Sequence, residues 1–334
     1  MQIMATTPPR KMSQLAQLAL ALAIAAAVPG SYAADWKPEK NVELIVGSAA
    51  GGPLDATARL IQRYGELKNI GVPITVQNRT GGAHAIAMTY LNQHAGDGHY
   101  IAMVLSNLLT NRITGSHPLT YTDVTPLAML SQEYIAVSVK ADSPIKSGRD
   151  LIERLKVAPD ALSFAIAGRA GGQHVAAGII MSVAGVDVRK LKFVSFKGGA
   201  EATPAVLGGH VDILMATPTS AWRHVQSGAL RMLAITAPQR LSGERAAVPT
   251  WKELGINAVM GNWRGVVGPR GLAAPQVAYW ERTLAEMVKS AEWQEAVTKH
   301  QWDNFHLNAA DTAKFLQEEY KTLTSLLREL GDAK

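Results

Sequence analysis

The residues best suited to chemistry lie in two loops of small side chains, each between an apolar run and a helical pattern. The first reads "IVGSAAGGPLDATAR" at residues 45–59. Glycine and alanine let a ligand approach the backbone closely. The start of the following helix presents free N–H groups and partial positive charge. We therefore expect this loop to bind an anion, in particular a carboxylate or a phosphate.

Two residues at the start of that helix have structural explanations of their own. Pro53 at a first-turn position costs no hydrogen bond. Asp55 either stabilises the helix start through its dipole or contacts the ligand, and the sequence leaves both roles open.

The second loop repeats the pattern in "LSFAIAGRAGGQHVAAGIIM", which starts at residue 162. Arg169 offers a planar fork of donors that suits a carboxylate, although an exposed loop arginine is the simpler alternative. His174 has either a binding role or a packing role at a helix start. Lys197 follows another apolar run. It either adds a second positive charge to the site or is an ordinary turn lysine.

Sharper catalytic motifs fail on their spacing. No lysine follows Gly51 or Gly52 as a phosphate-binding P-loop requires, and G-x-G-x-x-G is absent. "GSAAG" puts Ser48 one place too early for a nucleophile elbow, and "SPIK" at 143–146 lacks its partner motifs. The chain has no cysteine, no H-E-x-x-H and no paired carboxylates. We therefore expect no catalytic residues, no metal and no cofactor.

The elements around the loops alternate between strand-like and helical patterns. This alternation predicts an α/β fold with a largely parallel sheet, and the tail from 275 to 330 is expected to be helical throughout. Two similar loop units about 120 residues apart suggest two α/β lobes, each offering a loop where ligands of open α/β sheets bind. The expected strands are 42–46, 73–77, 100–105, 135–139, 162–167, 191–196, 211–216, 231–236 and 263–268, and expected helices include 53–67, 83–95, 148–156 and 172–184.

The first 33 residues have the pattern of a secretory signal peptide. Arg10 and Lys11 precede a 14-residue apolar run at 15–28, and "PGSYAAD" supplies small residues for cleavage. A membrane-spanning helix needs roughly 20 apolar residues, so a retained anchor is the weaker alternative. The sequence predicts export to the periplasm with cleavage after Ala33.

Charge composition also limits the partners. Removing Arg10 and Lys11 lowers the formal net charge from +6 to +4, and the remaining basic residues are dispersed. A nucleic-acid-binding surface needs clustered basic residues, so we expect no nucleic-acid partner. A mildly positive surface instead attracts small anions.

Eight segments extend over the chain after residue 33. They are "NVELIVGSAAGGPLDATARL", "VQNRTGGAHAIAMTYLNQHAGDGHY", "DSPIKSGRDLIERLK", "AIAGRAGGQHVAAGIIMSVAGV", "VSFKGGAEATPAVLGGHVDILMA", "GALRMLAITAPQRL", "VPTWKELGI" and "NWRGVVGPRGLAAPQVAYWE". Taken in order, they resemble the substrate-binding receptors of tripartite tricarboxylate transporters, the Bug or TctC family. The resemblance covers nearly all of the chain after residue 33, and "NWRGVVGP" and "VAYWE" look closest to the tricarboxylate-receptor branch.

The resemblance implies a fold like that of periplasmic binding proteins of type II. Two α/β lobes, one of residues 35–137 and 257–334 and one of 138–256, would be joined by crossing strands and close around a ligand. That ligand would be a small tricarboxylate, dicarboxylate or aromatic acid, delivered to membrane permease subunits by a monomeric receptor. The residues implied to bind it are Ser48, Ala50, Gly51, Asp55, Thr80, Gly81, Gly82, Ser106, Asn107, Gly168, Arg169, Ala170, Gly171, Gly172, His174, Lys197, Gly198 and Thr217.

The chain departs from the family pattern at the loops themselves. Gly47 and Ser48 stand where a Pro or Phe is common, Pro53 and Leu54 replace a Gly/Ser–Thr pair, and Arg169 replaces a small or polar residue. The added arginine favours a ligand with more than one carboxylate.

Two other functions remain open from the sequence. One is a receptor that presents its ligand to a membrane sensor kinase. The other is an exported hydrolase that uses Ser48 with His84 or His174.

Overall fold

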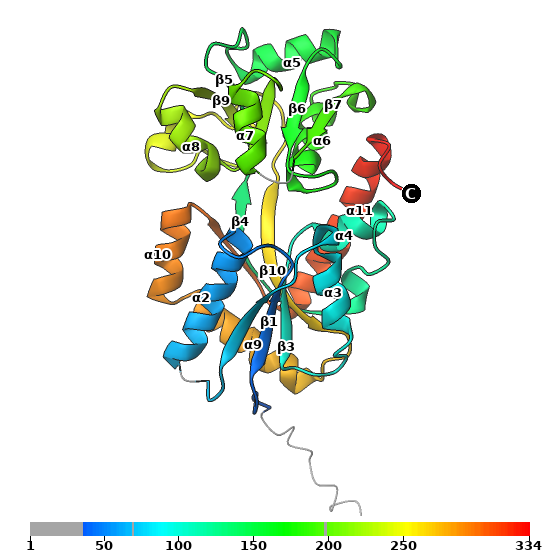
Figure 1. Cartoon of the computed structure of the whole chain (residues 1–334), viewed down its shortest axis with the longest axis vertical. Coiled ribbons are helices and arrows are strands. Elements are labelled where there is room, and N and C mark those ends of the chain that lie inside the picture. Colours follow the sequence, from blue (N-terminus) through cyan, green and yellow to red (C-terminus); the bar gives the residue numbers. More distant parts are fainter. Residues whose placement is uncertain (1–35, 69, 197–198) are drawn as a thin grey trace, which may run out of the picture. The chain divides into compact units, whose positions relative to one another are not determined.

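The computed structural model describes residues 36–68, 70–196 and 199–334. The predicted signal peptide, Lys197 and Gly198 lie outside these residues. Residues 37–334 form one compact unit that contains two mixed β-sheets with helices packed against them, as Figure 1 shows. This is the α/β architecture expected from the alternating pattern.

The first sheet has six strands in the order β11-β4-β10-β3-β1-β2. β1 pairs in parallel with both β2 and β3, whereas β10 and β11 pair antiparallel to their neighbours. The strands are β1 (Val42–Val46), β2 (Ile74–Asn78), β3 (Tyr100–Val104), β4 (Val124–Tyr134), β10 (Gly261–Pro269) and β11 (Asp303–Leu307).

The second sheet has five strands in the order β7-β6-β8-β5-β9. β6 pairs in parallel with β7 and β8, and β5 is antiparallel to β8 and β9. The strands are β5 (Ala136–Lys140), β6 (Ser163–Ile166), β7 (Lys192–Ser195), β8 (Ile213–Ala216) and β9 (Leu230–Ile235).

The chain passes between the sheets at two places. β4 of the first sheet ends at Tyr134, and β5 of the second begins at Ala136. The return runs from β9 through residues 236–260 into β10, and β10 pairs with β4 along its length. In Figure 1 both β4 and β10 run from one sheet towards the other.

Helices follow most strands, and several begin with the side-chain caps that their sequences indicate. Ser147, Ser290 and Asn308 each accept a hydrogen bond from a backbone N–H three residues later. The helices are α2 (Pro53–Lys68), α3 (Ala85–Asn92), α4 (Asn107–Ile113), α5 (Gly148–Val157), α6 (Gly172–Val183), α7 (Gly199–Leu207), α8 (Pro218–Gln226), α9 (Ala274–Met287), α10 (Ala291–His300) and α11 (Ala309–Glu329). No helix within the described ranges combines the length and apolar character needed to cross a bilayer.

Three sequence expectations need correction. The sheets are mixed rather than largely parallel, because the strands at the connections between them pair antiparallel with their neighbours. β4 was not expected, since "VTPLAMLSQEY" contains Pro126 and helix-favouring residues, yet it is buried between β10 and β11. The tail after residue 275 is not helical throughout, because β11 interrupts it and completes the sheet edge beside β4.

Candidate ligand-binding site

The parallel strands bring the predicted loops together in two sets. β1, β2 and β3 are parallel neighbours, so the loops after them lie at the same sheet edge. These loops hold residues 47–52, 79–84 and 105–107. In the second sheet β6 is parallel to both β7 and β8, so the loops after these strands also share one edge. The described residues of these loops are 167–171, 196 and 217. Each set precedes helix starts, as an anion site requires.

The first loop is shaped by the buried carboxylate of Asp55. This residue is 1% exposed. Its Oδ2 accepts from the Gly51 N–H at 2.9 Å and from Arg59 Nε at 2.8 Å, and its Oδ1 accepts from Asn78 Nδ2 at 2.9 Å. Asn78 also donates to the Ser48 carbonyl at 3.0 Å. These contacts support the structural role for Asp55, because its oxygens bind the protein itself.

The same contacts determine the charge of Asp55. Burial alone would raise its pKa, but the hydrogen bonds from Arg59, Gly51 and Asn78 outweigh burial and hold the pKa below its usual 3.8. The negative charge is therefore neutralised inside the loop, while Ala49, Ala50 and Gly51 stay exposed. An approaching anion meets exposed backbone rather than an acid.

The loop after β2 has four consecutive residues with positive φ. These are Gly81 (127°), Gly82 (56°), Ala83 (50°) and His84 (76°). The left-handed conformation costs a non-glycine residue about 1–2 kcal/mol, and such strain is concentrated at functional sites. Asn111 Nδ2 stabilises the turn by donating to the Ala83 carbonyl at 2.9 Å.

His84 links this turn to the first loop. A Cβ atom on Gly47 would lie 2.6 Å from the His84 side chain, so only glycine fits there. The close approach explains why this chain has Gly47 where the family pattern has larger residues. Sequence reasoning considered His84 only as a general base, and the left-handed turn that places it has no clear sequence signal beyond Gly81 and Gly82.

Ser106 and Thr217 act at helix starts. Ser106 is buried, and its carbonyl accepts from the N–H groups of Leu109 and Thr110 in α4. Thr217 caps α8 by accepting from the Ser220 N–H at 3.3 Å. Asn107 begins α4 directly after the strand β3.

The second small-residue loop is tied to the end of the chain. Arg169 Nη2 donates to Asp332 Oδ1 at 2.7 Å, although the Arg169 side chain stays 59% exposed. His174 is fully buried, its Nδ1 accepts from the Ala170 N–H at 3.0 Å, and its ring packs edge-on against Phe193. The structure therefore places Arg169 beside an acid, where the sequence predicted a free carboxylate ligand.

The catalytic alternative finds no geometric support within the described ranges. The buried Oγ of Ser48 has no hydrogen-bond partner among these residues, so the structure shows no hydrogen bond from Ser48 to His84 or His174. No group of three or more potential metal ligands occurs in the same ranges.

A buried ion pair between the connecting strands was missed by sequence reasoning. Arg264 of β10 is 2% exposed and Glu133 of β4 is 6% exposed, and Arg264 Nη2 donates to Glu133 Oε1 at 2.5 Å. The guanidinium carbon lies 4.7 Å from the centre of the Trp302 ring. The only sequence signal is a lone arginine in the apolar run "NWRGVVG".

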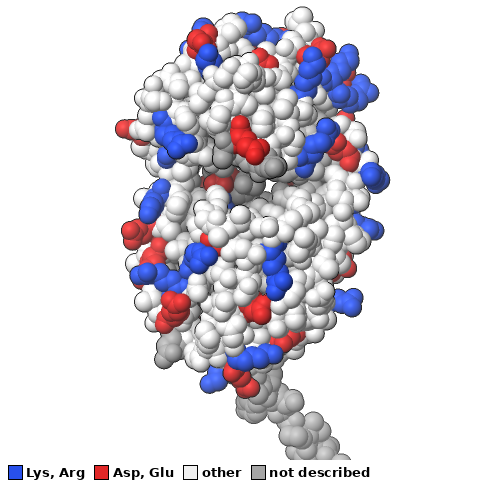
Figure 2. All heavy atoms as spheres, in the orientation of Figure 1, with Lys and Arg blue, Asp and Glu red and all other residues white. Residues whose placement is uncertain are grey.

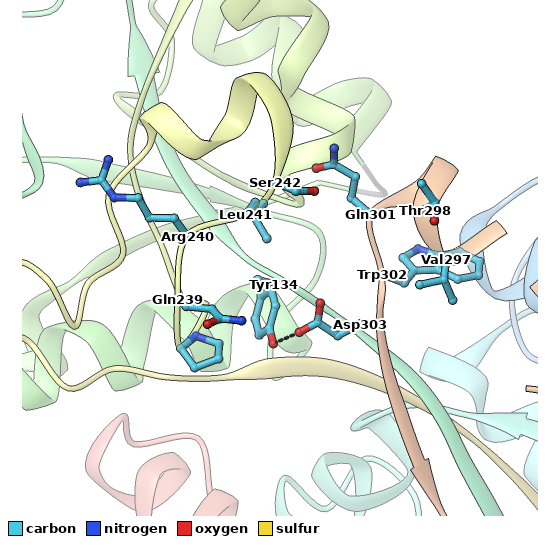
Figure 3. Close-up of a pocket in the computed structure, with 11 residues that line it drawn as sticks. Tyr134, Gln239, Arg240, Leu241, Ser242, Val297, Thr298, Gln301, Trp302 and Asp303 are labelled. Carbon is cyan, nitrogen blue, oxygen red and sulfur yellow. Dashed lines mark hydrogen bonds between the residues drawn. The ribbon is translucent and has the colours of Figure 1, made fainter. Parts of the chain in front are cut away.

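A pocket of about 290 Å³ lies beside these strands, as Figure 3 shows. The Tyr134 hydroxyl donates to the carboxylate of Asp303, while Arg240 points away and pairs with Glu253. The carboxylate of Asp303 disfavours an anion in this pocket. It contains none of the predicted site residues and is lined by Tyr134, Pro238, Gln239, Arg240, Leu241, Ser242, Val297, Thr298, Gln301, Trp302 and Asp303.

Surface charge agrees with the sequence analysis. Figure 2 shows basic and acidic side chains interspersed over the visible face, which is hollowed across the middle of the view.

The buried His174 predicts that the protein loses stability in mild acid. Burial lowers the pKa of His174 from 6.5 to about 4; Asp332 raises it and Arg169 lowers it further. The unfolded chain therefore binds the proton at higher pH than the folded chain. The stabilisation is fully present above pH 6.5 and is lost as the pH falls towards 4, on the order of 3 kcal/mol for this residue.

Urea unfolding at a series of pH values checks this. His174→Asn keeps an acceptor near the Nδ1 position. It should reduce the fall in the free energy of unfolding between pH 6.5 and 4. The exposed His210→Asn is the matched control and should leave the decline unchanged. Equal declines in wild type and His174→Asn would contradict the assignment.

Comparison with known proteins agrees with this architecture. A model of the tripartite tricarboxylate transporter family receptor, TctC, matches residues 57–332. A Cupriavidus necator protein encoded in the gbd 5' region is 28% identical, with 92% of this chain and 93% of that protein covered. BugT of Bordetella pertussis is 25% identical over 92% of this chain and 94% of its own length.

Solved structures show the same fold. A Rhodopseudomonas palustris protein solved with adipate has a TM-score of 0.76 at 23% identity, covering 89% of this chain and 99% of its own. MatC of the same organism, solved with malate, has a TM-score of 0.71 at 24% identity, covering 87% and 99%. Because the family model spans most of the chain, this protein belongs to the TctC family of tripartite tricarboxylate transporter receptors.

Proposed function

We propose that this protein is an exported receptor that captures a small organic carboxylate and delivers it to the membrane subunits of a tripartite tricarboxylate transporter. The observation that carries the proposal is the neutralised first loop. Asp55 is buried against Gly51, Arg59 and Asn78, so the loop exposes backbone at a helix start instead of negative charge.

The proposed site combines both sets of loops. Ser48, Ala50, Gly51, Thr80, Gly81, Gly82, Ser106 and Asn107 come from the first sheet's side. Gly168, Ala170, Gly171, Gly172 and Thr217 come from the second. Lys197 and Gly198 are included from the sequence alone. Backbone N–H groups and hydroxyls would supply most hydrogen bonds, which a charge enclosed by protein requires.

Two lobes of residues 35–137 with 257–334 and 138–256 would close over the ligand. The two sheets support this division, because among the described residues the chain passes between them near residue 135 and again within 236–260. The closed form would present the surface that the permease subunits recognise. A monomeric receptor, exported to the periplasm and cleaved after Ala33, is consistent with these roles.

The ligand class is a small carboxylate, by analogy with the malate and adipate of the two Rhodopseudomonas structures. A ligand present at 100 times its dissociation constant stabilises the folded state by about 2.7 kcal/mol, which raises the melting temperature by a few degrees. We therefore expect at least one of malate, adipate, citrate and benzoate to raise the melting temperature of residues 34–334. Neutral sugars of similar size are the control and should have no effect. Stabilisation by sugars alone would contradict the proposal.

A further inference from the structure

The structure assigns to Asp332 a role in positioning the second small-residue loop, residues 168–174, so that the loop can bind a ligand. This inference rests on the proposed function. It also gives Arg169 a different task from the ligand contact that the sequence suggested: Arg169 would fix the loop through Asp332.

The position of Asp332 follows from the way α11 ends. Leu330 caps the helix, and Gly331 follows with a φ of 75°. The Asp332 N–H donates to the Leu327 carbonyl at 2.8 Å, and the Gly331 N–H donates to the Arg328 carbonyl at 3.1 Å. This pair of bonds is a Schellman motif, in which glycine supplies the left-handed residue. The backbone alone therefore fixes where the Asp332 side chain begins.

The end of the chain is fixed on its other side as well. The Lys334 N–H donates to the Ile113 carbonyl at 2.9 Å, at the end of α4. Leu326 and Leu330 pack so closely on α6 that a Cβ atom on Gly178 would lie 2.8 Å from Leu330. Asp332 is thus held between α4, which follows a strand of the first sheet, and α6 of the second.

From this position Asp332 contacts both ends of the loop. Its Oδ1 accepts from Arg169 Nη2 at 2.7 Å. Its Oδ2 lies 3.4 Å from Nδ1 of His174 but makes no hydrogen bond there, because that nitrogen accepts from the Ala170 N–H. Asp332 is only 15% exposed, so the ion pair with Arg169 is partly shielded from water. Partial burial strengthens such a pair beyond an exposed surface pair.

The loop needs this support because its backbone is strained. Ala170, which has a Cβ, has a φ of 57°, whereas the φ of 93° at Gly168 costs a glycine little. The Ala170 N–H is directed to His174 Nδ1 at 3.0 Å. A left-handed alanine persists only where surrounding contacts outweigh its cost. Arg169 and His174 flank that alanine, and Asp332 faces both.

The two possible roles of Arg169 predict opposite effects of removing Asp332. If Arg169 binds the ligand directly, Asp332→Ala frees its guanidinium and affinity stays equal or rises. If Asp332 positions the loop, the loop relaxes and affinity falls, by about 10-fold for one lost charge-assisted bond.

Two measurements on the mature protein test the positioning role. The first is amide hydrogen exchange of residues 168–174, which needs no ligand and should be about 10-fold faster in Asp332→Ala. The second is titration calorimetry with whichever of malate, adipate or citrate stabilises wild type. Arg169→Ala and the double variant should lose no more affinity than Asp332→Ala alone, because both residues act on one loop.

Glu329→Gln is the matched control. Glu329 accepts from the Ser182 hydroxyl at 3.0 Å and so joins α11 to α6 without touching the loop. It should leave exchange and affinity unchanged. The inference would be overturned if residues 168–174 of Asp332→Ala exchanged at the wild-type rate, or if this variant bound the carboxylate more tightly than wild type. Failure of every carboxylate to bind wild type would count against the proposed function alone, since the exchange measurement still decides the role of Asp332.

Discussion

Glu133→Gln is expected to lower the free energy of unfolding by about 3–5 kcal/mol, the cost of leaving a buried charge without its partner. Arg264 is 2% exposed, and Glu133 is the acid that accepts its hydrogen bond. A buried guanidinium cannot escape this cost by losing its proton, because arginine remains charged in proteins. Urea unfolding followed by tryptophan fluorescence measures the effect.

Glu253→Gln is the matched control for that experiment. Glu253 also pairs with an arginine, Arg240, but both side chains are more than 40% exposed. Exposed pairs contribute about 0–1 kcal/mol, so this variant should unfold almost like wild type. If both variants lost the same free energy of unfolding, the ion pair of Glu133 and Arg264 would not stabilise the packing of β4 on β10 as its geometry indicates.

Gly171→Asp is expected to abolish carboxylate binding without destabilising the fold. Gly171 occupies the N-cap of α6 with a φ of −78° and a ψ of 170°, and a Cβ there meets only carbonyl oxygens at 3.5 Å. Aspartate favours this position because its carboxylate accepts the N–H groups of the first turn. That first turn begins at Gly172, a residue of the proposed site, and the new charge beside it would also repel an anion.

Gly171→Asn separates charge from shape. It caps the helix in the same way but carries no charge. We expect affinity to fall about 100-fold or more with aspartate and about 10-fold or less with asparagine. Both side chains compete with the ligand for the N–H groups, but only aspartate also repels its negative charge. Both variants should melt at or above the wild-type temperature.

The sequence predicts the framework well because its strongest signals are local. β1, α2, α5 and α6 lie within a residue or so of their expected bounds. β4 and β11 were missed because their formation depends on tertiary partners. β4 contains Pro126 and β11 is short and partly exposed, so neither has the periodic pattern of an isolated strand.

The site is less predictable, because its geometry depends on contacts between residues distant in sequence. The pairing of Arg169 with Asp332 joins residues 163 positions apart, and the buried pair of Glu133 and Arg264 joins residues 131 apart. Sequence could identify the small-residue loops from composition. It could not show that the Asp55 carboxylate accepts a hydrogen bond from Asn78 or that His84 packs against Gly47.

The most direct test of the central claim is titration calorimetry of wild type, Gly171→Asn and Gly171→Asp with the carboxylate that raises the melting temperature most. Binding through backbone N–H groups at the helix start predicts strong wild-type binding, a modest loss with asparagine and no detectable binding with aspartate. Wild-type affinity in the Gly171→Asp variant would contradict the claim and place the ligand elsewhere in the protein.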